Sequence, residues 1–547
     1  MYENCNERTG GAGKTGERAA TAGAVIRSGG QAEHALAANA DEGEKDLGEA
    51  DETPPQPPPA PLPDTPAAWF AAKFPALPAY HGDAVQEVFP PENKGRPFVK
   101  DVSEDFLSAT LGEAGTPAAP TVFMADEDRF YTYSPADGIY CQARESKLSA
   151  DLSALLLEGA RACVTKFDTR NLEFKFRDSS NLRGVLARAR GLLEVKQGFF
   201  ETDLMEFVPC LNGMLRVADR VILPFGPQYR RRNKLAVAYD AAATSPLFVE
   251  TLLQPALEPD DIDLLQRWCG LALIGVNLAQ RLVILTGTAG GGKGTVIRII
   301  NGIIGPTNVG TLRPDLLSER FELGRLLGKS LLYGADVQEN FLNCKGASVL
   351  KALTGGDPVT LEFKGSNERP EIICRFNAIV TCNSRLKVHL EGDAAAWRRR
   401  LAIVEYRKVK PEKVIADLSE RILADEASGV LNWMLDGLDK VHADEWQLVL
   451  TSDQQKLVDD LLLESEGDVV FGKESLRKDA MASLTVAQCF EAYVGFCNDR
   501  GWTAMAKKKF SNSIGDTVTR QFGLTVRNDI PDESGKAQRG WKGIRCA

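Results

Sequence analysis

The sequence predicts an α/β protein in which a central core is preceded by an α+β domain and followed by helical segments and a C-terminal winged-helix domain. Three observations support this prediction. In the run 282–295 an apolar strand leads into a glycine-rich loop and then a helix that begins near Lys293. Residues 1–66 are acidic and rich in Gly, Ala and Pro. Residues 477–547 are basic, and the pattern over 484–547 predicts two helices followed by two strands joined by a turn.

The N-terminal segment 1–66 holds 5 Lys and Arg against 12 Asp and Glu, while the whole chain carries a net charge of −10. Large apolar residues are too few there to offset the entropy of ordering, so we expect this segment to be disordered. Gly10 to Thr15 resembles a phosphate-binding loop, but Arg8 stands where its first glycine should be and no strand precedes it. We interpret this match as chance.

Residues 67–240 are expected to form the α+β domain. A hairpin is predicted around the turn Ser134-Pro135-Ala136-Asp137, and apolar spacing predicts helices over 147–163 and 180–197. Turn residues at Asn212-Gly213 and 224–227 predict strands within 207–240.

Asp126-Glu127-Asp128 allows two interpretations. Two carboxylates one residue apart on a strand are typical of a two-metal polymerase or primase site. The other interpretation is a solvated turn before the hairpin. The turn is favoured, since no second acidic or basic cluster supports a polymerase site.

Four further parts are expected along the rest of the chain. They are a helical collar over 241–278, an α/β core over 279–410, a helical segment over 411–475 and a basic winged-helix-like domain over 476–547.

The run from Leu282 to Thr295 carries the strongest chemical signal. Glycines allow successive backbone N–H groups to turn toward a phosphate, and the N-terminus of the following helix adds positive potential. Lys293 supplies a cation for the outer phosphates. The residues that would surround the phosphates are Gly287, Gly290, Gly291, Gly292, Lys293, Gly294 and Thr295.

Downstream side chains complete a nucleotide-hydrolase pattern. Leu331–Asp336 is an apolar strand that ends in a carboxylate, Asp336, placed to hold magnesium. Glu339 either polarises the attacking water or is an ordinary surface residue. A second strand, Ala378–Cys382, ends at Asn383, an amide that can sense the γ-phosphate.

Two basic features follow the same order along the chain. Residues 359–364 and 372–376 predict a β-hairpin with Lys364 near its tip. Arg398, Arg399 and Arg400 precede another strand, and one of them can reach the transferring phosphate of a neighbouring subunit. The other interpretation is a solvated basic patch, and spacing alone does not select the arginine.

Together these motifs resemble the superfamily 3 helicases, in particular the branch that contains phage and plasmid primase–helicases and the poxvirus primase–helicase. The resemblance rests on Gly287–Thr295, 321–329, 353–358, 381–383, and Asp393 with Trp397–Arg400, and more weakly on 208–213 and 264–270 upstream. It implies an AAA+-like P-loop ATPase core.

The resemblance also implies roles. Lys293 and the loop would bind ATP, Asp336 and Thr295 would hold Mg²⁺, and Asn383 would be the sensor. Arg399 or Arg400 would act on the neighbouring subunit, and Lys364 would track DNA. Family members form hexameric rings on single-stranded DNA and move 3′→5′.

The sequence departs from this family in two ways. Gly294 stands where the motif has a Ser or Thr for magnesium, and Thr295 comes one place late. Related proteins also carry a catalytic primase domain ahead of the helicase, whereas only 1–66 precedes the α+β domain here. We therefore expect no priming activity, with a separate primase or polymerase as a partner.

The C-terminal segment favours DNA as a partner. Phe510, Ile514, Val518 and Phe522 recur every fourth residue, which predicts a helix with one apolar stripe. Lys507, Lys508 and Lys509 lie off that stripe and would contact phosphates. The alternative is a subunit-docking module with a solvated basic face.

Composition limits the remaining classes. The chain has 11 Cys without a CxxC pair and only 4 His, which argues against a zinc site. No signal peptide or bilayer-length apolar stretch is present, so we expect a soluble, cytoplasmic protein. The leading hypothesis is an ATP-dependent DNA helicase of a phage, plasmid or other mobile element. A DNA-binding loader or origin-remodelling ATPase without processive unwinding is the alternative.

Overall fold

The computed structural model describes residues 64–338, 341–363, 369–383, 386, 394–407, 415–532 and 534–547. Contacts separate Met1–Pro61 from a second compact unit, Leu62–Ala547, to which the description below applies. Of the segment expected to be disordered, only residues 64–66 are described. There Thr65 caps helix α1, so ordered structure begins slightly before Ala67. Among the described residues no helix has the length and apolar character needed to span a bilayer.

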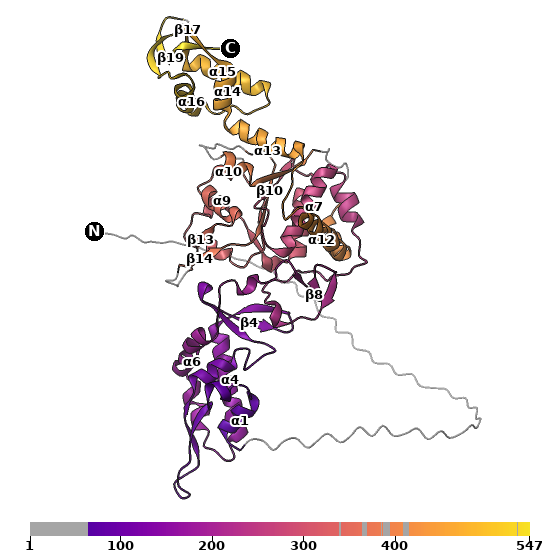
Figure 1. Cartoon of the computed structure of the whole chain (residues 1–547), viewed down its shortest axis with the longest axis vertical. Helices are drawn as coiled ribbons and strands as arrows, with labels where there is room; N and C mark the ends of the chain where they lie inside the picture. The colour runs from indigo at the N-terminus through magenta and orange to yellow at the C-terminus, as the bar shows by residue number, and fades with distance from the viewer. Residues whose placement is uncertain are drawn as a thin grey trace, which may run out of the picture. The chain divides into compact units, whose positions relative to one another are not determined.

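The part between residues 66 and 195 is an α+β arrangement (Figure 1). Strands β1 and β2 pair antiparallel, and a four-stranded sheet has the order β5-β4-β3-β6. The bounds are α1 (Pro66–Lys73), α2 (Pro78–His81), β1 (Val85–Val88), β2 (Phe98–Val102), α3 (Glu104–Thr110), β3 (Thr121–Met124), β4 (Arg129–Ser134), β5 (Ile139–Ala143), α4 (Glu145–Cys163), α5 (Arg170–Glu173), α6 (Ser179–Leu192) and β6 (Glu194–Val195).

The expected hairpin and the two expected helices are confirmed as β4–β5, α4 and α6. Ser134 donates its hydroxyl to Asp137 across the hairpin turn at 2.7 Å. Helix α6 ends at Leu192, five residues before the expected end, because Glu194 and Val195 pair with β3 instead.

A three-stranded antiparallel sheet follows, made of β7 (Phe207–Cys210), β8 (Gly213–Arg216) and β9 (Val221–Leu223). The turn at Asn212-Gly213 is confirmed, but the strands expected after Pro227 do not form. Instead Leu235 donates its N–H to Pro209 at 2.8 Å, and Ala236 donates to Ile303 at 3.0 Å. This stretch bridges β7 and the end of helix α8 (Lys293–Ile304) without joining a ladder.

The core is a five-stranded, all-parallel sheet with the order β11-β12-β15-β10-β16. Its strands are β10 (Leu282–Gly287), β11 (Val309–Thr311), β12 (Leu331–Gly334), β15 (Asn377–Cys382) and β16 (Leu401–Tyr406). They are predominantly apolar, as expected of strands covered on both faces, although β15 begins with Asn377 and β16 contains Glu405. Since β12, β15 and β10 are neighbours and point the same way, the residues that follow them meet at one edge.

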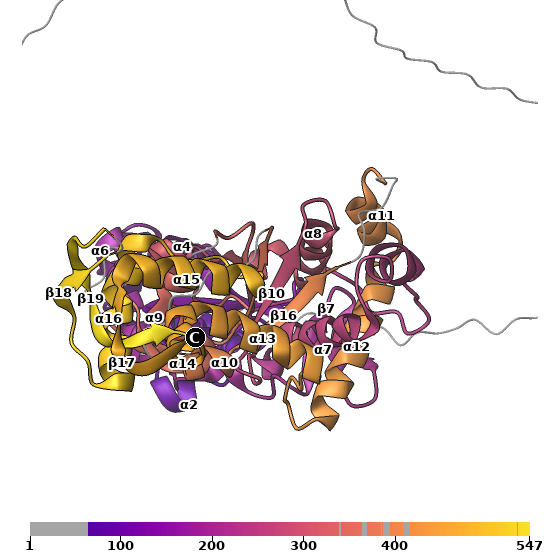
Figure 2. The same cartoon turned by 90° about the horizontal axis from the view of Figure 1, so that it is seen from above.

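Helices cover both faces of this sheet (Figure 1). Val283 and Leu285 of β10 pack with α7 (Pro259–Ile274), α8 (Lys293–Ile304) and α12 (Ala427–Ala443). Leu282 and Ile284 face the cluster that includes α9 (Ala347–Gly355) and α10 (Ala394–Arg398). A π-helix, Leu247–Leu253, precedes α7, and α11 (Leu418–Asp425) lies beside α8 (Figure 2). Strands β13 (Pro358–Thr360) and β14 (Glu371–Ile373) pair antiparallel.

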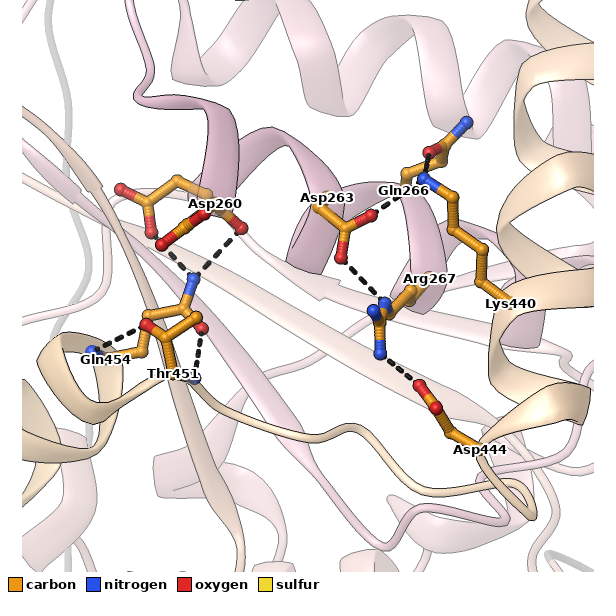
Figure 3. Close-up of polar contacts among 9 residues, drawn as sticks. Asp260, Asp263, Gln266, Arg267, Lys440, Asp444, Thr451 and Gln454 are labelled. Carbon is orange, nitrogen blue, oxygen red and sulfur yellow. Dashed lines mark hydrogen bonds and ion pairs between the residues drawn. The ribbon is translucent and has the colours of Figure 1, made fainter.

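Helices α7 and α12 pack closely because each contributes a glycine that faces the backbone of the other helix. A Cβ on Gly437 would lie 2.0 Å from the Gln266 carbonyl oxygen, and one on Gly270 would lie 2.3 Å from the Leu438 nitrogen. Polar contacts border this seam (Figure 3). Lys440 binds Asp263 at 2.7 Å and Gln266 at 2.6 Å, and Arg267 pairs with Asp263 and Asp444.

Helix α13 (Ser452–Ser465) is fixed to α7 at its first turn. Thr451 and Gln454 form a capping box, which satisfies N–H groups at the helix start. The Gln454 amide also donates to the Asp260 carbonyl at 3.0 Å and to the Asp261 carboxylate at 3.2 Å (Figure 3). Asp261 is buried, and this burial raises the pKa of its carboxyl group.

The C-terminal elements are α14 (Gly467–Ser475), β17 (Leu476–Thr485), α15 (Val486–Asp499), α16 (Lys507–Phe522), β18 (Arg527–Pro531) and β19 (Ala537–Cys546). Their antiparallel sheet has the order β17-β19-β18. The expected succession of two helices and two strands is confirmed. Strand β17 was not expected. Phe471 of α14 is buried in the hydrophobic core that these C-terminal elements share, so this unit begins before residue 476.

Candidate phosphate-binding site

The loop between β10 and α8 has a backbone that requires glycine. Gly287, Gly290 and Gly292 have φ of +137°, +83° and +97°, values that residues with a Cβ rarely adopt. A Cβ on Gly287 would also lie 2.6 Å from the Tyr406 carbonyl oxygen. The loop therefore lies directly on the end of β16, and its glycines serve both conformation and close packing.

Lys293 begins α8 and folds back over this loop. Its ammonium donates to the carbonyl oxygens of Gly287 at 2.7 Å and Thr288 at 2.9 Å. The residue is only 4% exposed. Burial lowers the pKa of the Lys293 ammonium, while the nearby Cys382 and Asp336 oppose that shift. In this arrangement two loop carbonyls accept the hydrogen bonds of the Lys293 ammonium.

Asp336 and Asn383 meet at the same edge, as the strand order requires. Asn383 donates its side-chain amide to the Asp336 carboxylate at 2.9 Å. The Asp336 backbone N–H donates to the Thr381 hydroxyl at 2.9 Å, and its φ of +44° places it in the left-handed region. The β12 and β15 termini are thus held together by side chains, and the exposed Asp336 carboxylate faces solvent.

These residues fit a magnesium ion that keeps most of its water ligands. Mg²⁺ in nucleotide sites is held by one or two protein oxygens together with phosphates, and Asp336 supplies a carboxylate near Lys293. Gly294 is exposed and offers no side-chain oxygen, whereas Thr295 is half-buried. Within the described ranges, no group of three or more His, Cys, Asp or Glu is placed to hold a metal ion.

Two residues of the sequence pattern lie outside the described residues, namely Glu339 and Lys364. Asp393 is outside them as well. The strands that flank Lys364 do pair, since Val359 of β13 is opposite Ile372 of β14. The hairpin expected from the sequence is therefore confirmed at its base.

The three arginines before β16 lie in different surroundings. Arg398 pairs with Asp459 of α13 at 2.9 Å. Arg400 is 5% exposed, and its guanidinium donates to the carbonyls of Lys351 at 3.1 Å and Ala396 at 3.0 Å. Arg399 is exposed. The structure thus separates Arg400, buried and bonded to backbone carbonyls, from the exposed Arg399.

Tyr406 contributes to the site, and the sequence did not identify it. It ends β16 beneath the loop, its ring lies 5.9 Å from the Lys293 ammonium, and it is buried. An aromatic residue at the end of an apolar strand looks like an ordinary core residue. Only its register opposite Gly287 in the β10–β16 pair reveals the contact.

The Asp126–Asp128 segment does not form a metal site. Glu127 is buried, accepts a hydrogen bond from the Tyr131 hydroxyl and pairs with Arg232, both at 2.5 Å. Asp128 pairs with Arg190 at 2.6 Å. The favoured turn before the hairpin is confirmed as a 3₁₀ turn, although Glu127 is enclosed rather than solvated.

At the C-terminal unit, Lys507, Lys508 and Lys509 form the exposed first turn of α16. Phe510, Ile514 and Val518 are buried on the opposite side, which confirms the apolar stripe. The three lysines are thus exposed on this side, and the Lys507 ammonium lies 5.9 Å from the centre of the Phe490 ring.

Comparison with known proteins gives limited further information. A family of unknown function (DUF5906) matches residues 285–400, the stretch from the strand before the glycine loop to Arg400. No curated protein matches the chain.

Three solved structures of the NrS-1 C-terminal region are similar to this chain at 12–13% identity. The A form apo structure has a TM-score of 0.43 and covers 78% of this chain and 97% of its own. The A form apo structure of residues 305–718 scores 0.44 and covers 80% and 99%. An apo structure of the same residues scores 0.44 and covers 81% and 100%.

Proposed function

We propose that this chain is an ATP-dependent DNA helicase of the superfamily 3 type. The observation that carries the proposal is the meeting of Lys293, Asp336 and Asn383 at one edge of a parallel sheet, beside a glycine loop. A cation, a magnesium-binding carboxylate and an amide sensor are the parts that phosphoryl transfer to water requires.

The chain's own residues would bind ATP in a defined way. Lys293 leaves the carbonyls of Gly287 and Thr288 and binds the outer phosphates, while the loop N–H groups and the α8 N-terminus hold the inner ones. Asn383 turns from Asp336 toward the γ-phosphate. Mg²⁺, held by Asp336 with Thr295 or water, would neutralise charge between the phosphates.

Hydrolysis also requires charge stabilisation from a neighbouring subunit, and Arg399 is our choice for it. Arg400 is buried and bonded to backbone carbonyls of its own subunit, whereas Arg399 is exposed and able to reach another chain. A hexameric ring would place each Arg399 against the next subunit's nucleotide. Glu339 is the proposed base for water.

DNA would be contacted at two places. Lys364, on the β13–β14 hairpin, would follow single-stranded or forked DNA through the ring, and Lys507–Lys509 would hold duplex phosphates. The C-terminal order of helix, strand, two helices and two strands supports a winged-helix unit. We further propose that the protein does not synthesise primers.

The deciding experiment measures ATP-dependent strand displacement on duplexes with a single 3′ or 5′ tail, beside Lys293→Ala. Displacement only from the 3′-tailed substrate, lost in the variant, is the expected result. Lys293-dependent ATP hydrolysis without displacement on either substrate would instead favour a loader or origin-remodelling ATPase. Lys364→Ala sharpens the test, because in a helicase it removes displacement and spares ATP hydrolysis. Template-directed oligoribonucleotide synthesis by the purified protein would contradict the absence of priming.

A further inference from the structure

A surface of the α+β part, remote in sequence from the ATPase motifs, combines exposed aromatic rings with unpaired cations. It is formed by residues 89–100, which comprise the β1–β2 loop and the start of β2, and by residues 161–177. Contacts hold the two segments together: the rings of Phe89 and Phe167 lie 5.7 Å apart, and Asp168 donates its N–H to the Pro97 carbonyl at 2.7 Å. Asn171 donates to the Val99 carbonyl at 2.6 Å. We call this surface the aromatic–basic face; its members are Phe89, Lys94, Lys100, Arg161, Phe174 and Lys175.

Two phenylalanines on this face are open to solvent. Phe89 is 63% exposed and Phe174 is 71% exposed, whereas the intervening Phe167 and Phe176 are buried. A large aromatic side chain in water forgoes the burial that normally stabilises it. Two such rings on segments fixed to each other indicate a surface that meets a partner.

The charge of this face opposes that of the whole chain. Residues 89–100 and 161–177 hold 8 Lys and Arg against 3 Asp and Glu, although the chain as a whole has a net charge of −10. Lys166 pairs with Asp64, and Arg170 pairs with Asp168 at 2.5 Å. Among the described residues Lys94, Lys100, Arg161 and Lys175 are exposed and form no ion pair.

We propose that the aromatic–basic face binds single-stranded nucleic acid. Bases stack on exposed aromatic rings while Lys and Arg contact the phosphates, and this combination is typical of sequence-tolerant single-strand binding. A membrane is a poorer fit. Helix α5 has only four residues, so Phe174 does not belong to an amphipathic helix that could lie in a lipid interface.

The residues of this surface are different from Lys364 and Lys507–Lys509, and the proposed binding does not require nucleotide. An additional binding site for single-stranded nucleic acid would let the chain stay bound to it while the ATPase core exchanges nucleotide. The inference therefore goes beyond the proposed helicase activity and survives if that activity is absent.

The test measures binding of a fluorescent oligothymidylate of about 20 nucleotides to the full chain, without ATP, by anisotropy. The Lys507, Lys508 and Lys509→Gln background removes the C-terminal contribution. Phe89→Ala with Phe174→Ala is expected to weaken binding at least about tenfold. Tyr80→Ala is the matched control, because Tyr80 is 83% exposed and its flanks, 74–83, contain no Lys or Arg.

Charge and contact are tested separately. Lys94→Gln with Lys175→Gln is expected to reduce the slope of log affinity against log salt by about 0.7 for each lost phosphate contact. Ultraviolet cross-linking followed by mass spectrometry should place the oligonucleotide on peptides containing Phe89 or Phe174. All of these side chains are exposed, so unchanged melting temperatures confirm that the variants fold.

Three results would overturn the proposal. One is unchanged oligonucleotide affinity in the phenylalanine double variant. A second is that the same variant loses binding to anionic lipid vesicles while its oligonucleotide binding stays intact, which would assign the face to a membrane. The third is that the phenylalanine double variant loses binding to a synthetic peptide of residues 41–63 but keeps its oligonucleotide affinity. That result would assign the aromatic–basic face to the chain's own acidic segment. Since none of these assays uses ATP, failure of the helicase proposal would leave their result unaffected.

Discussion

Gly294 offers the sharpest test of the site's geometry. It lies in the first turn of α8, directly after Lys293, where nucleotide hydrolases have a hydroxyl for magnesium. No heavy atom lies within 4 Å of where its Cβ would be, and the residue is exposed. Two substitutions are therefore informative: Gly294→Ala adds only the Cβ, and Gly294→Ser adds the missing hydroxyl.

The stability effect follows from the helix. Replacing glycine by alanine at a position with compatible backbone stabilises a protein by about 0.4–1 kcal/mol, and serine gains about half as much. In a domain of ordinary size this raises the melting temperature by about 1–4 °C. Both variants should therefore melt above the parent, with alanine ahead of serine.

The functional effect should separate the two variants. ATP hydrolysis is measured while Mg²⁺ is titrated, and Gly294→Ser is expected to reach half-saturation at a several-fold lower Mg²⁺ concentration than Gly294→Ala. Equal Mg²⁺ dependence would refute the reasoning that this position faces the metal. A lower melting temperature for Gly294→Ala than for the parent would refute the inference that the space beside Gly294 is open.

Three further predictions follow from packing, charge and exposure. Gly437→Ala is expected to destabilise the protein by about 1–3 kcal/mol in urea unfolding, because the new methyl meets α7, whereas Gly191→Ala at an open position should not. Burial raises the pKa of Asp261 in the folded protein, so ionising this carboxyl group lowers the free energy of unfolding as pH rises. The melting temperature of Asp261→Asn should therefore exceed that of the parent by a margin that grows as pH rises above the ordinary Asp pKa of about 4, and a constant difference would contradict this. Arg400→Ala should lower the melting temperature, whereas Arg399→Ala should spare it and reduce ATP hydrolysis.

Much of the site could be predicted because it depends on local patterns and strand order. The loop is a contiguous motif, and Asp336 and Asn383 each follow an apolar strand. Parallel neighbours place such residues at one edge, so their meeting follows from topology alone. The two arginines differ only in tertiary surroundings: Arg400 lies under α9 and Arg399 does not. No spacing rule contains that information.

The elements that sequence reasoning missed depend on distant partners. Strand β17 contains charged and small residues in the run Arg477–Ser483, and it forms because it pairs with β19 about 60 residues later. Leu235 and Val237 have strand-like character, yet their backbone bonds go singly to β7 and the turn after it. Glu127 is adjacent to two other acidic residues, but Arg232, far along the chain, determines its environment.

The attachment of α13 has a mechanical consequence. Its first turn is tied to α7 through Gln454, Asp459 in its middle is paired with Arg398, and Val458 and Leu461 pack in the same cluster as Trp397. This helix leads directly to the C-terminal unit. A pull on that unit along α13 must therefore either shift the arginine segment with it or rupture the Arg398–Asp459 pair. Force on the C-terminal unit would therefore be transmitted through α13 to Arg398, the residue next to Arg399.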